Sequence, residues 1–383
     1  MQAAVVAGEP QLLRGPAPQK TEARLMSLDA LRGFDMLCIL GIDRLLISLA
    51  KASDSHLLQV LGNQMTHVPW AGLHFYDLIF PLFIFIVGVS LVFSLSKIID
   101  RNGRRFAVRR VLLRSLILFL LGIFYMGGLA GGFANVYLAG VLQRIAGAYV
   151  FAGLIFCFLR ERPRVMVTIC VVLLVGYWAL LTFVPVPGIG HASYERGVNL
   201  AHYIDVHFLP GRSNSDPVDF EGSLLNTLGA VANCLLGVFA GLLLQSKKVI
   251  EQKKVLWLCG AGGLSILLGC LWGLQFPIIK LLWTSSYVLV TCGISAILLG
   301  LFYQIIDIWK FQKWSLPFAW VGMNAITIYL VANMVSFPRL AQRLVGGEVF
   351  FGAYGGVVVE LVALGLELWF VQFLYSRKLF LRL

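Results

Sequence analysis

Long apolar runs separated by short polar segments dominate this sequence. A helix needs about 20 mainly apolar residues to cross the ~30 Å hydrocarbon core of a bilayer. Runs of that length lie at 27–49, 75–97, 106–128, 137–159, 164–185, 222–245, 255–276, 282–306, 316–336 and 350–374. The pattern therefore predicts an all-α fold, a polytopic membrane helix bundle of about ten transmembrane helices.

One of these runs differs from the others because a polar head precedes it. Residues 66–90 read THVPWAGLHFYDLIFPLFIFIVGVS, and no charge follows Asp77 until Lys97. Ionisable side chains beside a membrane-spanning helix are costly and are usually kept for function. His67 and Asp77 are therefore the first candidates for chemistry, with Trp70 between them.

Composition supports a membrane protein and excludes other classes. The 383 residues are 59% hydrophobic and 13% charged, a balance that a soluble domain of this size does not tolerate. The net charge of +12 does not indicate nucleic-acid binding, because the basic residues lie in alternate connections between apolar runs. The seven cysteines fall inside apolar runs without metal-ligand spacing, so neither disulfides nor a metal site is expected.

The distribution of Lys and Arg predicts an orientation in the membrane. Connections such as 97–114 and 246–254 are rich in these residues, whereas the alternate connections hold few. The positive-inside rule then places both termini in the cytoplasm.

The predicted domain organisation follows from the same pattern. Residues 1–25 are expected to be a disordered cytoplasmic tail, and residues 26–383 to form a single transmembrane domain. Two long connections, 50–74 and 186–221, lie on the outer side, where they are expected to form one external vestibule.

The first predicted span carries an unusual number of charges. At 100° per residue, Asp29, Arg32, Asp43 and Arg44 share one face of this helix. That face must look into the bundle, because charges facing lipid are costly. Two interpretations stay open: internal ion pairs that fix helix packing, as for Asp29 with Arg32, or the lining of a polar path.

Further polar residues map to the predicted spans. Arg144, next to Gln143, is expected either to pair with Asp43 or Asp77 or to contact substrate. Single Asn and Ser residues in membrane helices usually serve helix contacts. The remaining candidates for substrate binding are Asn226, Trp283, Ser285 and Asn324. His67, Asp77, Arg144, Asn226 and Ser285 are all predicted to lie in the outer half, where one pocket would collect them.

The role of His67 is open on its sequence context alone. A histidine at a helix entrance is often a cap or an interfacial residue. With a nearby Asp it could couple protons in a transporter, because imidazole titrates near neutral pH. As a catalyst it would be a general base, or a nucleophile that accepts an acyl group.

An ordered set of motifs resembles a known enzyme family. They are RLMSLDALRGFDM (24–36), HVPWAGLHFYDLIFPLFIFIVG (67–88), GVLQR (140–144), DPVDFEGSLLNTL (216–228), GVFAG (237–241), LWTSSYV (282–288) and GMNAITIY (322–329). Together they resemble the family of heparan-α-glucosaminide N-acetyltransferase and its bacterial relatives. The resemblance covers nearly all of the chain from Arg24 onward. It is that of a bacterial-type member without the family's long lumenal N-terminal domain.

The resemblance implies a reaction and a set of site residues. The family uses cytosolic acetyl-CoA to acetylate the amine of a glucosamine across the membrane, with His67 matching its essential histidine. Trp70, Asp77, Gln143 and Arg144 match pocket residues. No metal is implied. The expected acceptor is glucosamine or a short chitin-type fragment rather than a heparan chain.

Physical chemistry adds further expectations to this resemblance. The phosphates of acetyl-CoA need basic groups at the inner face, for which Arg32, Arg105 and Arg109 are candidate donor-binding residues. Asp29, on the same helix face as Arg32, is the fourth candidate donor-binding residue, as part of the lining of the polar path. The acetyl group must then reach His67 through a channel or by a relay. Asp77 would orient the His67 ring, as in hydrolytic triads. Asn226 or Ser285 would serve the oxyanion.

Competing functions remain. The main alternative is a proton-coupled secondary transporter of an amino sugar, and a third is an O-acyltransferase of envelope glycans. The expected location is the bacterial inner membrane. The expected partners are acetyl-CoA, an amino-sugar acceptor and membrane lipid, with a homodimer as one option and no nucleic acid.

Overall fold

The computed structural model describes residues 25–211 and 224–381, and these parts of the chain are helical without a named strand. The first half contains α1 (Met26–Leu37), α2 (Asp43–Ala52), α3 (His56–Gln64), α4 (Ile79–Asn102), α5 (Arg104–Tyr125), α6 (Val141–Leu159), α7 (Pro163–Phe183) and α8 (Leu200–Phe208). The second half contains α9 (Thr227–Gln245), α10 (Glu251–Gly273), α11 (Ser285–Phe302), α12 (Leu316–Met323), α13 (Ala325–Met334), α14 (Phe337–Val345), α15 (Glu348–Phe351) and α16 (Gly355–Ser376). The predicted all-α bundle is confirmed.

Among the described residues, seven helices are long and apolar enough to cross a membrane, at Phe75–Asn102, Val141–Leu159, Pro163–Phe183, Thr227–Gln245, Glu251–Gly273, Ser285–Ile308 and Val349–Ser376. An eighth span results if Lys313–Met323 and Ala325–Met334, bent by 66°, count as one. The other two predicted spans, 27–49 and 106–128, are helical but rich in charge, which sets them apart from the apolar ones. A total of ten therefore stays a prediction.

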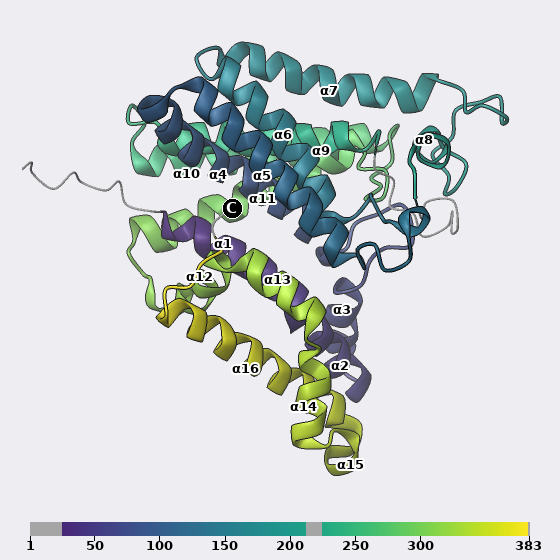
Figure 1. Cartoon of the computed structure of the whole chain (residues 1–383), viewed down its shortest axis with the longest axis vertical. Helices are drawn as coiled ribbons and strands as arrows, with labels where there is room; N and C mark the ends of the chain where they lie inside the picture. Colours follow the sequence, from purple (N-terminus) through teal and green to yellow (C-terminus); the bar gives the residue numbers. More distant parts are fainter. Residues whose placement is uncertain (1–24, 212–223, 382–383) are drawn as a thin grey trace, which may run out of the picture.

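The bundle has two large hydrophobic cores, and α1 contributes to both. The larger core draws on α4–α7 and α9–α11, whereas the smaller one lies among α12, α13, α14 and α16. Figure 1 shows α1, α12, α13 and α16 as a layer beside α4, α5 and α6. The functional cavities described below lie along the boundary between these two cores.

The α1–α12 contact is close because two glycines face each other. A Cβ on Gly33 would overlap the Phe318 carbonyl oxygen, and one on Gly322 would overlap the Asp29 carbonyl oxygen. Small residues let membrane helices approach closely enough for backbone contact. Directly after this contact the chain breaks at Asn324, and α13 leaves in a new direction.

A π-helical turn, Cys38–Ile42, interrupts the first predicted span. Such a turn holds more residues than an α-helical turn, so the α2 residues are rotated relative to a continuous helix. Arg44 accordingly leaves the predicted face and pairs with Glu360 of α16 at 3.0 Å. The single charged face expected from a regular helix is therefore wrong for Arg44.

The long connections contain helices of their own. The 50–74 segment holds the end of α2 and α3, and the described part of the 186–221 segment holds α8. The rest of that segment, 212–223, and residues 1–24 of the predicted tail lie outside the described residues. The cytoplasmic placement of the termini stays a prediction.

Candidate active site

The loop that precedes α4 folds around the buried Asp77 side chain. One carboxylate oxygen lies 2.7 Å from Nδ1 of His67, and the other accepts the backbone N–H groups of His74 at 3.0 Å and Val68 at 3.4 Å. Carboxylates accept backbone N–H groups well at the start of a helix. The same contacts leave Asp77 fully buried while the His67 side chain is 48% exposed. The structure thus forms the His67–Asp77 pair that the sequence suggested.

Lys280 joins this pair from the connection between α10 and α11. Its Nζ lies 3.0 Å from both ring nitrogens of His67 and 3.6 Å from an Asp77 oxygen. Lys280 is only 8% exposed. The sequence patterns considered above do not single out Lys280; the one available signal is its position inside the apolar stretch FPIIKLLW.

Backbone contacts bring the two segments together. Ala71 and Ile279 form an antiparallel bridge, and the N–H of Gly72 donates to the Ile278 carbonyl oxygen at 2.9 Å. Tyr287 Oη also donates to the Asp77 carbonyl oxygen at 2.6 Å. The relative position of Asp77 and Lys280 is therefore set by the fold rather than by flexible side chains alone.

Tyr76 covers the other side of His67. The two ring centroids are 4.8 Å apart, and Tyr76 Oη donates to an Asp43 carboxylate oxygen at 3.0 Å. Asp43 therefore reaches the site through Tyr76 and does not pair with Arg144.

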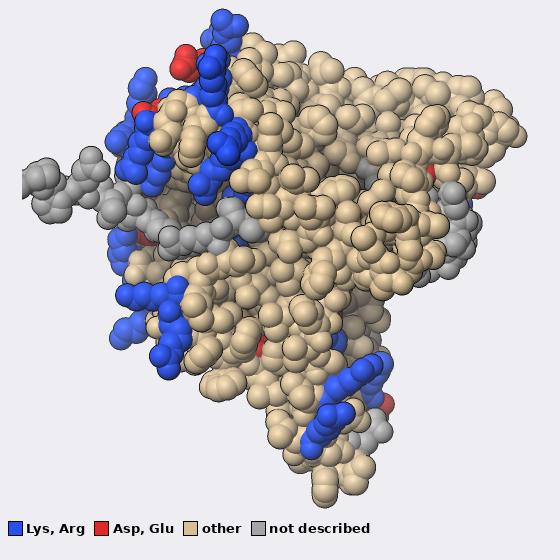
Figure 2. Space-filling model, viewed as in Figure 1, with Lys and Arg blue, Asp and Glu red and all other residues tan. Residues whose placement is uncertain are grey.

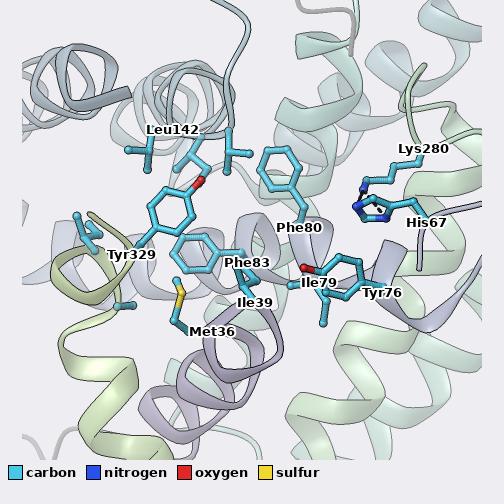
Figure 3. Close-up of a pocket in the computed structure, with 14 residues that line it drawn as sticks. Met36, Ile39, His67, Tyr76, Ile79, Phe80, Phe83, Leu142, Lys280 and Tyr329 are labelled. Atoms are coloured by element: carbon cyan, nitrogen blue, oxygen red, sulfur yellow. Dashed lines mark hydrogen bonds between the residues drawn. The ribbon is translucent and has the colours of Figure 1, made fainter. Parts of the chain in front are cut away.

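A cavity of about 170 Å³ begins at His67 and Lys280 and runs between the two cores. In Figure 3, these two side chains point toward each other at one end, and Tyr329 lies at the other. Most of the wall is apolar, with Phe80 and Phe83 of α4 and Leu142 of α6 among its residues.

A larger cavity of about 670 Å³ continues along the same boundary. It shares five lining residues with the first cavity: Phe83, Leu142, Ile145, Ala325 and Ile326. Its polar lining residues include Asp29, Arg32, Lys97, Arg110 and Arg114. We call the end of the bundle that holds Lys97, Arg110 and Arg114 the basic end. Figure 2 shows Lys and Arg gathered there, where Figure 1 places the α4–α5 connection.

Some predicted donor-binding residues line this larger cavity and others do not. Arg32 pairs with Asp29 at 3.4 Å and donates to Ser90 Oγ at 2.5 Å, so it is both an ion-pair partner and a lining residue. Arg105 and Arg109 are not among the lining residues. Helical phase is the reason, because Arg110 and Arg114, four positions apart, lie on the face of α5 that lines the cavity, although Arg110 is as exposed as the other two. Asn324 also lines this cavity, at the α12–α13 break.

Gln143 and Arg144 lie on a different face of α6. Both line a largely apolar cavity of about 710 Å³ among α5, α6, α7 and α9. The Arg144 guanidinium stands over the rings of Phe80 at 5.6 Å and Trp283 at 5.0 Å. The structure thus separates these two residues from the His67 cavity, which the adjacent Leu142 and Ile145 line instead.

Asn226, Trp283 and Ser285 support the segment that carries Lys280. Asn226 Nδ2 donates to the Leu281 carbonyl oxygen at 2.6 Å, and Ser285 Oγ donates to that of Leu174 at 2.7 Å. The Trp283 ring packs against Phe80. All three are fully buried and line neither the His67 cavity nor the larger cavity that adjoins it.

Trp70 lies beside the site in an open groove of about 630 Å³. Its Nε1 donates to the Tyr194 carbonyl oxygen at 2.9 Å, which attaches the 186–211 segment to the His67 loop. His191 and Glu195 also line this groove. Within the described parts of the chain, no group of three or more His, Cys, Asp or Glu could hold a metal ion.

Comparison with known proteins adds two relatives. Heparan-alpha-glucosaminide N-acetyltransferase of Mus musculus is 28% identical over 377 residues, which cover 82% of this chain and 56% of the relative. The chain resembles the heparan-alpha-glucosaminide N-acetyltransferases. The Homo sapiens protein of the same name is 29% identical over 322 residues, covering 69% of this chain and 48% of the relative. The family resemblance read from the motifs is thereby confirmed.

The similarity to these relatives covers only part of their length. The chain spans about half the length of the curated relatives it matches. No protein-family model matches the sequence. With its apolar helices, the chain is an integral membrane protein.

Proposed function

We propose that this protein is a transmembrane N-acetyltransferase that moves an acetyl group from acetyl-CoA to the amine of glucosamine or a glucosaminide. One observation carries the proposal. A boundary between two cores holds two adjoining cavities, with basic side chains at one end and the His67–Asp77 pair at the other. The names of the two relatives supply the reaction class.

The larger cavity suits the anionic part of the donor. Coenzyme A carries its phosphates at one end of a long, flexible arm and its thiol at the other. Arg110, Arg114 and Lys97 offer cationic partners for phosphates at the basic end. Arg32, already paired with Asp29, stands further along the path.

The shared part of the two cavities suits the slim arm of the donor. Lys97 and Ile79 lie eighteen residues apart on α4, which corresponds to about 27 Å along a helix. Lys97 lines the larger cavity and Ile79 lines the smaller one. An extended donor that follows α4 therefore brings its thioester to His67.

The reaction at His67 is a direct transfer assisted by a general base. The acceptor amine gives a proton to a ring nitrogen of His67 as its lone pair attacks the thioester carbonyl carbon. Asp77 bonds to Nδ1, fixes the orientation of the ring and balances the charge that the ring gains. The carbon–sulfur bond then breaks, and the sulfur receives the proton from His67.

The two substrates approach His67 from opposite sides. The excess of Lys and Arg at the basic end supports a cytoplasmic location for that end, and the proposed setting is the bacterial inner membrane. The His67 side chain is 48% exposed, and the groove lined by Trp70 lies beside the loop that carries it. That groove offers space for glucosamine or a short amino-sugar fragment.

The test is turnover by the purified protein. In detergent or lipid nanodiscs, acetyl-CoA and glucosamine should yield free CoA and N-acetylglucosamine, measured with a thiol reagent and by mass spectrometry. His67→Ala should reduce CoA release by at least about 100-fold, because general-base catalysis contributes on the order of 10²–10⁴. His56→Ala, at an exposed histidine that begins α3, is the matched control and should keep wild-type activity.

Two results would contradict the proposal. One is the absence of turnover with any amino sugar, together with proton-dependent uptake of glucosamine into vesicles, which would establish transport instead. The other is full activity of the His67→Ala variant, which would exclude His67 as the base.

A further inference from the structure

Lys280 has no role in the reaction proposed above, yet its side chain lies against His67. Its ammonium lies within hydrogen-bond reach of both ring nitrogens of His67, at 3.0 Å, and faces Asp77 at 3.6 Å. A lysine that only marked topology would extend its charge into water. This one turns its charge into the cavity wall and is 8% exposed.

The backbone on both sides of Lys280 is fixed by several buried hydrogen bonds. Thr284 Oγ1 accepts the Ile279 N–H at 3.1 Å and donates to the Pro277 carbonyl oxygen at 2.9 Å. Ser286 Oγ donates to the Phe276 carbonyl oxygen at 2.6 Å.

The backbone that follows Lys280 is held in the same way. Tyr177 Oη donates to the Leu282 carbonyl oxygen, and Asn226 Nδ2 donates to the Leu281 carbonyl oxygen. Such support keeps a charged group in place before the reaction begins.

Charged groups of both signs lie around His67. The titratable groups that face the ring are Asp77 and Tyr76 from the segment before α4, and Lys280 from the α10–α11 connection. Asp43 of α2 reaches the ring only through Tyr76. The Asp77 carboxylate, 3.6 Å from the Lys280 Nζ, balances the ammonium charge at the wall of an apolar cavity.

The reaction also needs a group that stabilises negative charge. When an amine attacks the thioester, the carbonyl oxygen becomes an oxyanion close to the base. Asn226 and Ser285 cannot easily serve, because their donor groups already bond to carbonyl oxygens outside the cavity. Among the described residues that line the His67 cavity, Lys280 is the one Lys or Arg.

We propose that Lys280 is a catalytic residue of the acetyl transfer, binding the oxyanion through its ammonium beside the base His67. The proposal rests on the transferase function proposed above. It names a third group of the same site, 213 positions from His67 in the sequence.

The step balances with Lys280 protonated throughout. The amine nitrogen forms a bond to the acetyl carbon, the carbonyl π electrons move to oxygen, and the amine proton moves to His67. The oxyanion accepts an N–H of Lys280. When the carbonyl re-forms, the carbon–sulfur bond breaks, the electron pair goes to sulfur, and the His67 proton follows. The products are the amide and the free thiol.

The variants that test this role are Lys280→Met and Lys280→Arg, with Lys51→Met as the control at an exposed lysine of α2. Lys280→Met should lower kcat by on the order of 10²–10³, the usual loss for one oxyanion donor, with little change in KM for acetyl-CoA. Lys280→Arg keeps the charge and should recover at least a tenth of wild-type kcat. Thermal unfolding of each variant shows that the fold is retained.

Rescue by a conservative variant separates a catalytic role from a merely structural one. Lys280→Met removes the ammonium, whereas Lys280→Arg keeps a cation at the same place. If the cation binds the oxyanion, the loss of kcat should follow the loss of charge, while the two variants unfold at similar temperatures.

Two outcomes overturn the inference while the transferase function stands. In one, Lys280→Met retains wild-type kcat. In the other, Lys280→Arg retains no more kcat than Lys280→Met although both variants stay folded, so that the charge is not what the reaction requires. If the wild-type protein itself turns over no amino sugar, the proposed function fails, and the catalytic role of Lys280 fails with it.

Discussion

Asp77 stands at the centre of the site because its two carboxylate oxygens have different tasks. One holds His67, and the other accepts the backbone N–H groups of His74 and Val68. The residue that orients the candidate base therefore also shapes the loop that carries it. The sequence predicted this pair, because a carboxylate that follows a histidine in the same polar segment can orient the imidazole ring. It did not predict Lys280, which approaches from a distant segment.

Asp77→Asn should affect both tasks. The amide keeps the size of the side chain, but its NH₂ group cannot accept the His74 and Val68 N–H groups or stabilise a charged His67 ring. We expect kcat to fall by on the order of 10²–10⁴, and stability to fall by about 1–3 kcal/mol for a buried donor left unsatisfied.

The measurements are CoA release and thermal unfolding of Asp77→Asn beside Tyr76→Phe. The Tyr76 variant removes only the hydroxyl that bonds Asp43 and leaves the ring against His67. Its kcat should stay within a few-fold of wild type. Equal losses in both variants would mean that general disturbance of the loop, rather than the Asp77 carboxylate, explains the effect.

At the level of helices, two irregularities decide which side chains face the cavities. The π-helical turn Cys38–Ile42 separates the direction of Arg44 from that of Arg32. The break at Asn324 brings Ala325 and Ile326 into the wall shared by both cavities. A regular helical period of 3.6 residues cannot represent a π-helical turn or a helix break. Because the prediction assumed that period, it placed all four charges of the first span on one face.

The close α1–α12 contact gives a prediction at this scale. Gly322→Ala places a Cβ where the Asp29 carbonyl oxygen lies, so the two helices must separate. We expect a loss of about 1–3 kcal/mol, as for other overpacked sites, and a higher KM for acetyl-CoA because Asp29 and Arg32 line the donor cavity.

Gly365→Ala is the matched control in the thermal unfolding measurement. A Cβ on Gly365 in α16 would meet no atom within 4 Å. Its melting temperature should equal or exceed that of the wild type, because alanine favours a helix more than glycine does. If the melting temperature of Gly322→Ala equals that of the control, α1 and α12 can accommodate the added methyl group, and their contact does not determine the shape of the cavity.

On the scale of the whole molecule, function depends on the boundary between two hydrophobic cores. The boundary between the cores holds two adjoining cavities, one at the basic end and one at His67. Figure 2 shows where the positive charge gathers at that end. The pairing of a charged entrance with an apolar path is what relates the architecture to a long anionic donor.

Replacing both Arg110 and Arg114 by Gln tests this relation. The double variant should raise KM for acetyl-CoA by about tenfold or more, since charge-assisted bonds to phosphate each contribute about 1.5–3 kcal/mol. At saturating donor, kcat should stay near the wild-type value, because His67 is remote. Isothermal titration calorimetry with CoA, at low and high salt, measures the same loss as binding.

Arg105→Gln with Arg109→Gln is the control pair on the same helix. Both side chains are exposed and line neither the His67 cavity nor the larger cavity that adjoins it, so CoA affinity should change little. If this pair of substitutions lowered CoA affinity more than the Arg110 and Arg114 pair did, the donor would bind at Arg105 and Arg109, as the sequence alone suggested.

The apolar pattern by itself determined the all-α membrane bundle, because the length and composition of a span are local requirements of the bilayer. Local spacing also identified His67 with Asp77, and Asp29 with Arg32. Only the tertiary structure decided which arginines of α5 face inward and which residue completes the site. Lys280 meets His67 across 213 positions through the bridge of Ala71 with Ile279. Such proximity arises from packing between segments, which no local pattern in the chain encodes.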